Sequence, residues 1–210
     1  MSKPLLLLLG AGGHARACID VIEEEGRFEI AGLTGLPQEV GSKVMGYSVL
    51  GTDNDLAMLL LKYKHAIVSV GQIKSPAVRM TLFGKLAKSG CSQPKIASPR
   101  AHVSRHALIG AGSIIMHGAI VNAGAMVGQN CIINSLALVE HDTIIGDHCH
   151  VSTAAAINSG VRVGSGTFIG SNACVRQGIR IGDGCVIGMG QHVITDCDAG
   201  VWIPPRKQIA

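Results

Sequence analysis

Branched aliphatic residues recur at every sixth position throughout the C-terminal half of the chain. The unbroken series is Val103, Ile109, Ile115, Val121, Val127, Ile133, Val139, Ile145, Val151, Ile157, Val163, Ile169, Val175, Ile181, Ile187 and Val193. A fixed short repeat is typical of solenoids, in which stacked repeats bury one continuous core. The period predicts short strands with inward aliphatic side chains. Three hexads would form one triangular coil, so stacked neighbours would lie 18 residues apart.

The position four residues after each aliphatic residue is mostly occupied by a small side chain. Examples are Ala107, Ser113, Ala119, Ala125, Ala137, Thr143, Ala155, Thr167 and Ala173, joined by Cys131, Cys149, Cys185 and Cys197. A small side chain fits the narrow space beside a corner of the coil. Cysteine behaves there as a small buried hydrophobe, which favours a packing role over a disulfide or a metal site.

The first hundred residues alternate between apolar runs and amphipathic stretches. Strands are predicted at Leu5–Leu9, Phe28–Leu33 and Ala66–Val70. Helices are predicted through Ala17, Cys18, Val21 and Ile22 with an end at Gly26, after a cap at Asp53, and from Ser75-Pro76 to Lys88. This alternation is typical of a small parallel α/β unit. With a junction at Pro94 to Pro99, we predict an α/β domain over residues 1–96 and a parallel β-helix over residues 97–210.

A glycine-rich turn follows the first predicted strand. Gly10-x-Gly12-x-x-Ala15 matches the fingerprint in which backbone amides at a helix N-terminus approach a diphosphate. An NAD site would also carry an acid after the second strand, where this chain has Thr34-Gly35. The turn therefore favours a nucleotide-sugar or another phosphate-bearing ligand over NAD, and the alternative is a tight strand–helix turn without a ligand.

Composition narrows the remaining classes of function. Hydrophobic residues make up 47% of the 210 residues and aromatic residues 3%, and the net charge is +4. No dense Lys/Arg run is present and few aromatics are available to stack on bases, so nucleic acid is not an expected partner. The run Leu5–Leu9 is too short for a signal-peptide core or a membrane span, which predicts a cytoplasmic protein with no membrane partner.

Three of the nine histidines lie between residues 139 and 150. His141 falls two residues after an inward aliphatic residue, hence at a corner, between Glu140 and Asp142. An imidazole paired with a carboxylate is a suitable general base near neutral pH. Zinc is an alternative, with His148 and His150 as ligands, but no two histidines have the 18-residue spacing of stacked coils, so we expect no metal. For His65, His102, His106 and His192 we expect a surface or structural role.

The chain resembles the NeuD-type sugar O-acyltransferase family, which includes N-acetyltransferases of nucleotide-linked 4-amino-dideoxy sugars. The resemblance rests on Gly10-Ala11-Gly12-Gly13-His14, Val70-Gly71, the hexads, Glu140-His141-Asp142 and His150-Val151-Ser152. It implies that the β-helix is left-handed and that the chain is an acetyltransferase using acetyl-CoA. It also implies a homotrimer with each active site at a subunit interface.

The resemblance assigns roles to individual residues. His141 matches the catalytic base and Asp142 the acid that orients it, while His150 matches a histidine that contacts the acetyl donor. The positions that match the nucleotide-sugar pocket are Gly12, Gly13, His14 and Gly71. The positions expected along the pantetheine arm are Ser159, Ser171 and Gly188.

Two segments depart from the family pattern. Thr34-Gly35 replaces the usual acids after the second strand, and Trp202-Ile203-Pro204-Pro205-Arg206 replaces the family's C-terminal segment, where Arg206 and Lys207 could meet the phosphates of CoA. The expected activity is N-acetylation of a nucleotide-linked 4-amino-dideoxy sugar in bacterial surface glycan biosynthesis. O-acetylation of a sialic acid is the first alternative. A zinc enzyme of the carbonic anhydrase kind and a non-catalytic binding module are the others.

Overall fold

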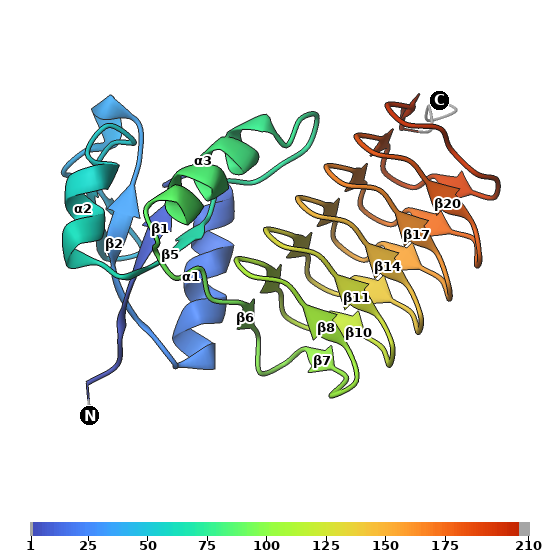
Figure 1. Ribbon diagram of the computed structural model, residues 1–210, viewed down its shortest axis with the longest axis horizontal. Coiled ribbons are helices and arrows are strands. Elements are labelled where there is room, and N and C mark those ends of the chain that lie inside the picture. The colour runs from blue at the N-terminus through green and yellow to red at the C-terminus, as the bar shows by residue number, and fades with distance from the viewer. Residues whose placement is uncertain (1, 206–210) are drawn as a thin grey trace.

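The structure, a computed structural model, describes residues 2–205 and consists of an α/β domain beside a parallel β-helix (Figure 1). The α/β sheet has the strand order β3-β4-β2-β1-β5. Its strands are β1 (Leu5–Leu9), β2 (Glu29–Thr34), β3 (Lys43–Val44), β4 (Tyr47–Gly51) and β5 (His65–Val68). All neighbours are parallel except β3 and β4, which form a hairpin that the sequence analysis did not predict.

Helices α1 (Gly13–Glu25), α2 (Leu56–Lys62) and α3 (Ala77–Lys88) pack on this sheet, and a short 3-10 helix, η1, spans Pro37–Glu39. The predicted end of α1 at Gly26 is confirmed, with φ of 69° and an amide that donates to the carbonyl of Ile22. The predicted cap of α2 at Asp53 is wrong. Asp55 holds that position, and its carboxylate accepts hydrogen bonds from the amide and hydroxyl of Thr52. Helix α3 begins one residue after the predicted Ser75-Pro76 start.

The β-helix has three parallel sheets, named here the first, second and third faces. The first face is formed by β7 (His102–Val103), β10 (Ile120–Val121), β13 (Leu138–Val139), β16 (Ala156–Ile157), β19 (Cys174–Val175) and β22 (His192–Val193). The second is formed by β8 (Leu108–Ile109), β11 (Met126–Val127), β14 (Ile144–Ile145), β17 (Arg162–Val163) and β20 (Arg180–Ile181). The third is formed by β6 (Ile96–Ala97), β9 (Ile114–Ile115), β12 (Ile132–Ile133), β15 (His150–Val151), β18 (Phe168–Ile169), β21 (Val186–Ile187) and β23 (Trp202–Ile203).

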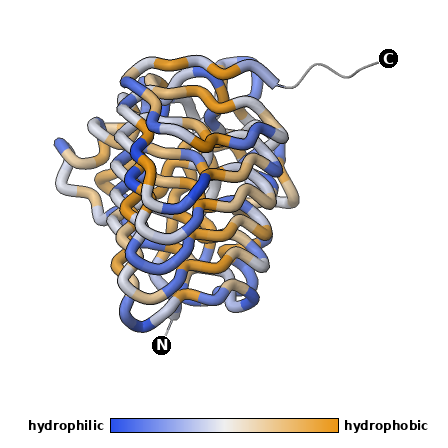
Figure 2. Tube along the Cα trace, turned by 90° about the vertical axis from the view of Figure 1, so that its right-hand side faces the viewer, coloured by the Kyte–Doolittle hydropathy of each residue, from blue (hydrophilic) through white to orange (hydrophobic). Residues whose placement is uncertain are grey.

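The predicted stacking at 18 residues is confirmed along all three faces. Val121 pairs with Val139, and Val139 with Ile157, so the aliphatic side chains form inward ladders in one buried core. Hydrophobic positions recur from coil to coil in the same register (Figure 2). The coil is the left-handed parallel β-helix that the resemblance implied.

The cysteines of the solenoid do more than fill space. Cys131, Cys149 and Cys185 are fully buried between the second and third faces, and all seven cysteines are free thiols. The thiols of Cys131 and Cys149 lie 3.1 Å from the carbonyls of Gly146 and Gly164 in the coil above. These thiols therefore pack as small hydrophobes, as predicted, and also donate to carbonyls inside the corner.

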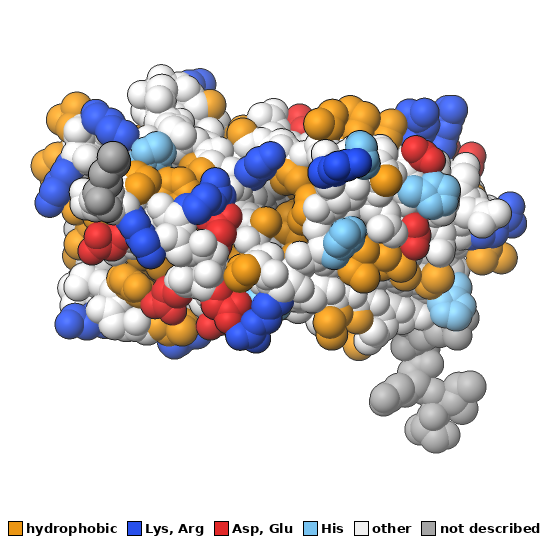
Figure 3. Space-filling view, turned by 90° about the horizontal axis from the view of Figure 1, so that it is seen from below, with side chains coloured by type: hydrophobic (Ala, Val, Ile, Leu, Met, Phe, Trp, Pro, Cys, Tyr) orange, Lys and Arg blue, Asp and Glu red, His pale blue; other side chains and the backbone are white. Residues whose placement is uncertain are grey.

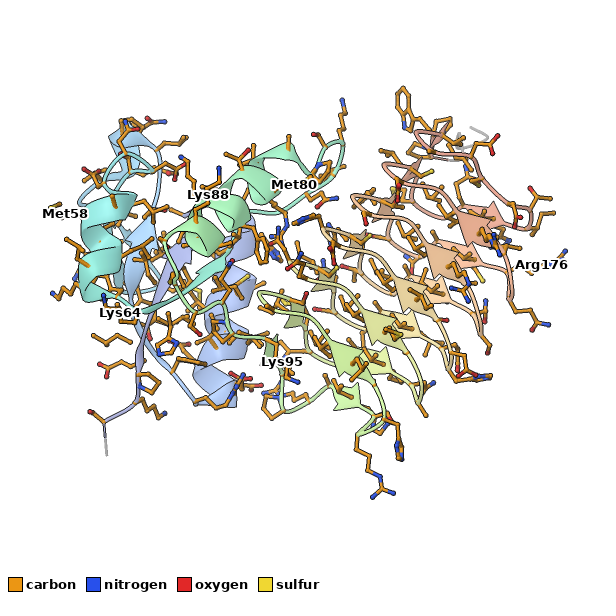
Figure 4. The ribbon with its side chains drawn as sticks, viewed as in Figure 1. Met58, Lys64, Met80, Lys88, Lys95 and Arg176 are labelled. Carbon is orange, nitrogen blue, oxygen red and sulfur yellow. The ribbon has the colours of Figure 1, made fainter. Side chains whose placement is uncertain are left out.

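The α/β domain covers the third face of the solenoid. The outward side chains of Ile96, Ile114 and Ile132 lie in one buried cluster with Ile19 and Ile22 of α1. The edge between the first and second faces, named here the first corner, therefore lies on the opposite side of the solenoid from the α/β domain. Arg176, two coils above Glu140 on this corner, points away from that domain (Figure 4).

Candidate active site

The first corner carries a histidine–carboxylate pair on the turn between β13 and β14. His141 Nδ1 lies 2.8 Å from Asp142 Oδ2, and both side chains are more than half exposed. Because a carboxylate only accepts hydrogen bonds, Nδ1 must carry the proton when the imidazole is neutral. The lone pair of Nε2 then points away from Asp142, which is the arrangement of a general base.

Glu140, the other acid beside His141, has a different role. Its Oε2 accepts hydrogen bonds from the Asn122 side chain, at 2.9 Å, and from the backbone amide of His141, at 3.1 Å. Glu140 therefore fixes the backbone of the turn, and Asp142 is the acid that contacts the imidazole. Asp142 is also the acid to which the family resemblance assigned this role.

The three residues expected along the pantetheine arm fall on two different corners. Ser159 shares the first corner with His141, one coil above, where the amide of Gly160 donates to the carbonyl of His141. Ser171 lies at the corner between the third and first faces, with its hydroxyl 3.0 Å from that of Ser152. Gly188 follows β21, and a Cβ there would lie 2.3 Å from the nitrogen of Pro205. Only Ser159 is thus brought to His141, while Arg206 and Lys207 lie outside the described residues.

His150 lies on the third face, beneath the α/β domain, and is 6% exposed. Its Nδ1 donates to the carbonyl of Gln72 at 2.6 Å, and its Nε2 accepts from the side chain of Asn134 at 3.1 Å. Burial, with a smaller contribution from nearby Arg79, lowers the pKa of His150 to about 4, so the ring is neutral at pH 7. Both ring nitrogens are occupied, so the predicted contact with the acetyl donor requires Asn134 to release the ring.

A pocket of about 630 Å³ lies at the carboxyl ends of β1, β2 and β5. All four residues predicted for the nucleotide-sugar pocket, Gly12, Gly13, His14 and Gly71, line it. Gly12 and Gly13 form the start of α1, which has no side-chain cap, so its free amides face the pocket. Ligands of parallel α/β sheets bind at this edge, which makes the pocket the candidate acceptor site.

His14 forms part of the pocket wall beside the solenoid. Its ring centroid lies 6.4 Å from that of His150, and its Nε2 has no hydrogen-bond partner among the described residues. Burial and the charge of Arg79 lower the pKa of His14 to about 3, so this ring is also neutral. The neutral rings of His14 and His150 therefore lie between the pocket and the third face and are polar but uncharged.

The acids that the sequence seemed to lack after β2 come from elsewhere in the fold. Glu39 of η1 and Asp53, which follows β4, line the same pocket as Thr34 and Gly35. A Cβ on Gly35 would lie 2.7 Å from Glu39 Oε2, so glycine leaves room for this carboxylate. Asp53 reaches the pocket because β4, which was not predicted, pairs with β2 and brings the following loop there, whereas Glu39 reaches it from η1, between β2 and β3.

Arg79 of α3 is a further buried residue that sequence analysis missed. Its guanidinium donates to the backbone carbonyl and the side-chain Oδ1 of Asn130, both at 2.8 Å, and to the carbonyl of Val70 at 2.6 Å. Burial lowers the pKa of Arg79 to about 10, so it remains charged at neutral pH. Arg79 therefore links the pocket loop after β5 to the solenoid through carbonyl and amide oxygens.

The pocket and the His141–Asp142 pair are separated within one chain. Every residue that lines the pocket belongs to the α/β domain, whereas His141 lies on the corner opposite the face that this domain covers. Between residues 2 and 205 we find no group of three His, Cys, Asp or Glu side chains that could hold a metal ion. No helix in that range is both long and apolar enough to span a bilayer.

Comparisons with known proteins agree with this arrangement. The family model of the PglD N-terminal domain matches residues 5–86, and that of the hexapeptide repeat of succinyl-transferase matches residues 160–194. No curated protein matches the chain in sequence.

Several solved structures match almost the whole chain. PerB from Caulobacter crescentus, in complex with CoA and GDP-perosamine, is 31% identical with a TM-score of 0.87, covering 94% of this chain and 92% of that one. A variant of perosamine N-acetyltransferase from the same organism, with one histidine replaced by asparagine and the same two ligands, is 30% identical with a TM-score of 0.88, covering 94% and 91%. The acetyltransferase domain of PglB from Neisseria gonorrhoeae, in complex with acetyl coenzyme A, is 28% identical with a TM-score of 0.86, covering 99% and 100%.

The match extends over both domains and includes the glycine-rich turn at the pocket as well as the hexapeptide coils that carry His141. It agrees with the resemblance that the sequence motifs indicated. The chain therefore belongs to the PglD-type sugar acetyltransferases, a family of hexapeptide-repeat acyltransferases.

Proposed function

We propose that this protein transfers the acetyl group of acetyl-CoA to the amino group of a nucleotide-linked 4-amino-dideoxy sugar, a reaction of bacterial surface glycan biosynthesis in the cytoplasm. The observation that carries the proposal is the exposed His141, whose Nδ1 is held by Asp142. The similar proteins solved with CoA and GDP-perosamine support the choice of donor and acceptor.

In the proposed reaction the acceptor amine attacks the thioester carbonyl carbon directly. His141 Nε2 removes a proton from the attacking nitrogen, and Asp142 stabilises the imidazolium that forms. The tetrahedral intermediate then collapses, the C–S bond breaks, and the CoA sulfur leaves and takes the proton from the imidazolium. The products are the N-acetyl sugar and CoA, and His141 is neutral again.

Each complete site is proposed to combine two chains. The acceptor pocket of one chain would meet the first corner of a second copy, because within one chain the two lie on opposite sides of the solenoid. Exposed apolar side chains support such an association: Leu108 and Met126 on the second face and Ile120 on the first face flank this corner in the coils below His141. Hydrophobic and histidine side chains are exposed together on the solenoid half of the surface (Figure 3). A homotrimer, the expected assembly, would bury this surface.

The pocket favours a nucleotide-linked acceptor over free sialic acid. Its described lining residues include no Lys or Arg to pair with the carboxylate of a sialic acid, but they include the uncapped start of α1, which suits a diphosphate. Glu39 and Asp53 add negative charge, which favours a sugar that carries an amine.

The test is CoA release by the purified protein with acetyl-CoA and a set of acceptors. The acceptors are GDP- and UDP-linked 4-amino-4,6-dideoxy sugars, N-acetylneuraminic acid and a blank. Release with an amino sugar that exceeds the blank supports the proposal. Release with the sialic acid alone would replace it with O-acetylation, and release equal to the blank throughout would refute the acceptor class.

A further inference from the structure

We propose that Gly124 is a positioning residue for the proposed catalytic pair: it leaves the space that the Asp142 carboxylate occupies while it holds His141. This inference rests on the proposed function, in which the pair supplies the general base. Gly124 lies on the first corner in the coil directly below, 18 residues before Asp142. Neither sequence motifs nor the family resemblance singled it out.

The backbone of Asp142 shows why it needs support from the coil below. Its φ is 60°, in the left-handed region that side-chain-bearing residues rarely adopt. Glycine occupies the equivalent corner position in the neighbouring coils, with φ of 74° at Gly124, 68° at Gly160 and 74° at Gly178. Asp142 is thus a side chain at a position where the coil directly below and the two coils above use glycine. Strained backbone of this kind is often retained at functional sites.

Contacts with the coil below fix the turn in this conformation. The amide of Asp142 donates to the carbonyl of Ala123 at 3.2 Å, and the Asn122 side chain donates to Glu140, which in turn accepts from the amide of His141. Residues 122–124 therefore support the turn from the coil below through two hydrogen bonds, one from Asn122 to Glu140 and one from the amide of Asp142 to Ala123.

Gly124 contributes to this support by leaving room for the Asp142 carboxylate. A Cβ at Gly124 would lie 2.5 Å from Asp142 Oδ1, far closer than van der Waals contact allows, and 3.5 Å from its Cγ. Any side chain here forces the carboxylate to move, and Oδ2 of the same carboxylate is the atom that holds His141 Nδ1 at 2.8 Å. A methyl group at position 124 would therefore act on His141 through Asp142.

The chain provides a matched control for the strain of the substitution. Gly178 has the same φ as Gly124 and lies on the same corner, but a Cβ there meets nothing within 4 Å. Gly124→Ala and Gly178→Ala therefore introduce the same backbone strain, and only the first displaces Asp142. The solenoid tolerates alanine in this conformation, as Ala154 with φ of 55° demonstrates.

The kinetic test compares Gly124→Ala, Gly178→Ala, Asp142→Ala and the double variant Gly124→Ala/Asp142→Ala in the acetyl-transfer assay. We expect Gly124→Ala to lower kcat by about 10- to 100-fold with unchanged KM for both substrates, since a small displacement of a catalytic group has this effect. The kcat of Gly178→Ala should stay within about twofold of that of the unsubstituted protein, while its Tm should change by about as much as that of Gly124→Ala. In the Asp142→Ala background, Gly124→Ala should cause almost no further loss, because it acts through the missing carboxylate.

Equal losses in Gly124→Ala and Gly178→Ala, or an undiminished effect of Gly124→Ala without Asp142, would overturn the inference. A wild-type rate in Asp142→Ala would instead remove Asp142 from the proposed mechanism. A second measurement does not depend on the acceptor: ¹⁵N NMR of labelled histidines, with His141→Gln to assign the signal, reports the tautomer of His141. The Nδ1–H form should predominate in the unsubstituted protein and in Gly178→Ala. If Gly124→Ala retained it to the same extent, Gly124 would not position Asp142.

Discussion

If each site combines the pocket of one chain with the His141 of another, two inactive variants should restore activity when they form mixed oligomers. The first variant is His141→Ala, which loses the base but keeps the pocket. The second is Gly12→Asp, which keeps His141 but places a carboxylate where the start of α1 faces the pocket. The position accepts a side chain, since a Cβ on Gly12 meets nothing within 4 Å, and aspartate is a favourable N-cap residue. The second variant should therefore fold and repel a phosphate-bearing ligand.

The expected recovery follows from counting. In oligomers formed at random from equal amounts of the two variants, a site is complete only when the pocket comes from the first and the histidine from the second. This combination has a probability of about one quarter in any closed ring, whether dimer or trimer. The mixture should therefore reach about 25% of the unsubstituted rate per site after joint unfolding and refolding or co-expression.

The assay is CoA release, with the two variants mixed without subunit exchange as the control. Recovery near zero in oligomers proven to contain both variants, for instance by two different affinity tags, would refute the two-chain site. It would mean that the pocket and the histidine of one chain serve the same acceptor, in conflict with their positions on opposite sides of the solenoid.

Three further predictions address the base, the junction between domains and the buried histidines. His141→Ala should lower kcat about 10²- to 10⁴-fold with an unchanged Tm, because the side chain is exposed and acts as a general base; a rate within twofold of the unsubstituted protein would remove it from this role. Arg79→Ala should lower the free energy of unfolding, measured by urea denaturation, by about 2–4 kcal/mol, because it leaves the buried oxygens of Asn130 without their donor. The control Arg162→Ala removes an exposed side chain of the second face and should change it by less than about 0.5 kcal/mol. The pKa of His150 is lower in the folded protein than in the unfolded chain, so its contribution to stability is complete above about pH 6.5 and is lost as the pH falls through about 4, a loss of about 3 kcal/mol. The Tm of His150→Asn should therefore fall less steeply with acid than that of the unsubstituted protein, and an equally steep fall would contradict this prediction.

The solenoid was predictable from sequence because a six-residue repeat of this length fits no other regular structure. A branched aliphatic residue at every sixth position satisfies neither a helix nor an ordinary alternating strand, so the pattern by itself requires short stacked strands and places His141 at a corner. Its stacking interval of 18 residues follows from the same period.

The parts that sequence reasoning missed depend on contacts between segments far apart in the chain. Arg79 resembles any basic residue on an amphipathic helix until α3 docks against Asn130 of the solenoid. Glu39 and Asp53 look like surface acids until η1 and the loop after β4 fold over the same pocket. The assignment of Asp53 as a cap was wrong because the amide and hydroxyl of Thr52 donate to the carboxylate of Asp55, so the helix begins after Asp55. Local propensity alone does not reveal this pairing.

The β-helix also explains how an exposed and strained pair can be held in place without a buried active site. Each coil is joined to its neighbours by a ladder of parallel hydrogen bonds, so the coil below a corner has a fixed register relative to it. A side chain projecting from one coil can therefore be supported by residues 18 positions earlier, as Asn122 and Gly124 support the turn of Glu140 to Asp142. Catalytic groups on such a scaffold need support from the coil below them, and glycines that appear to be only turn formers can determine where a carboxylate lies.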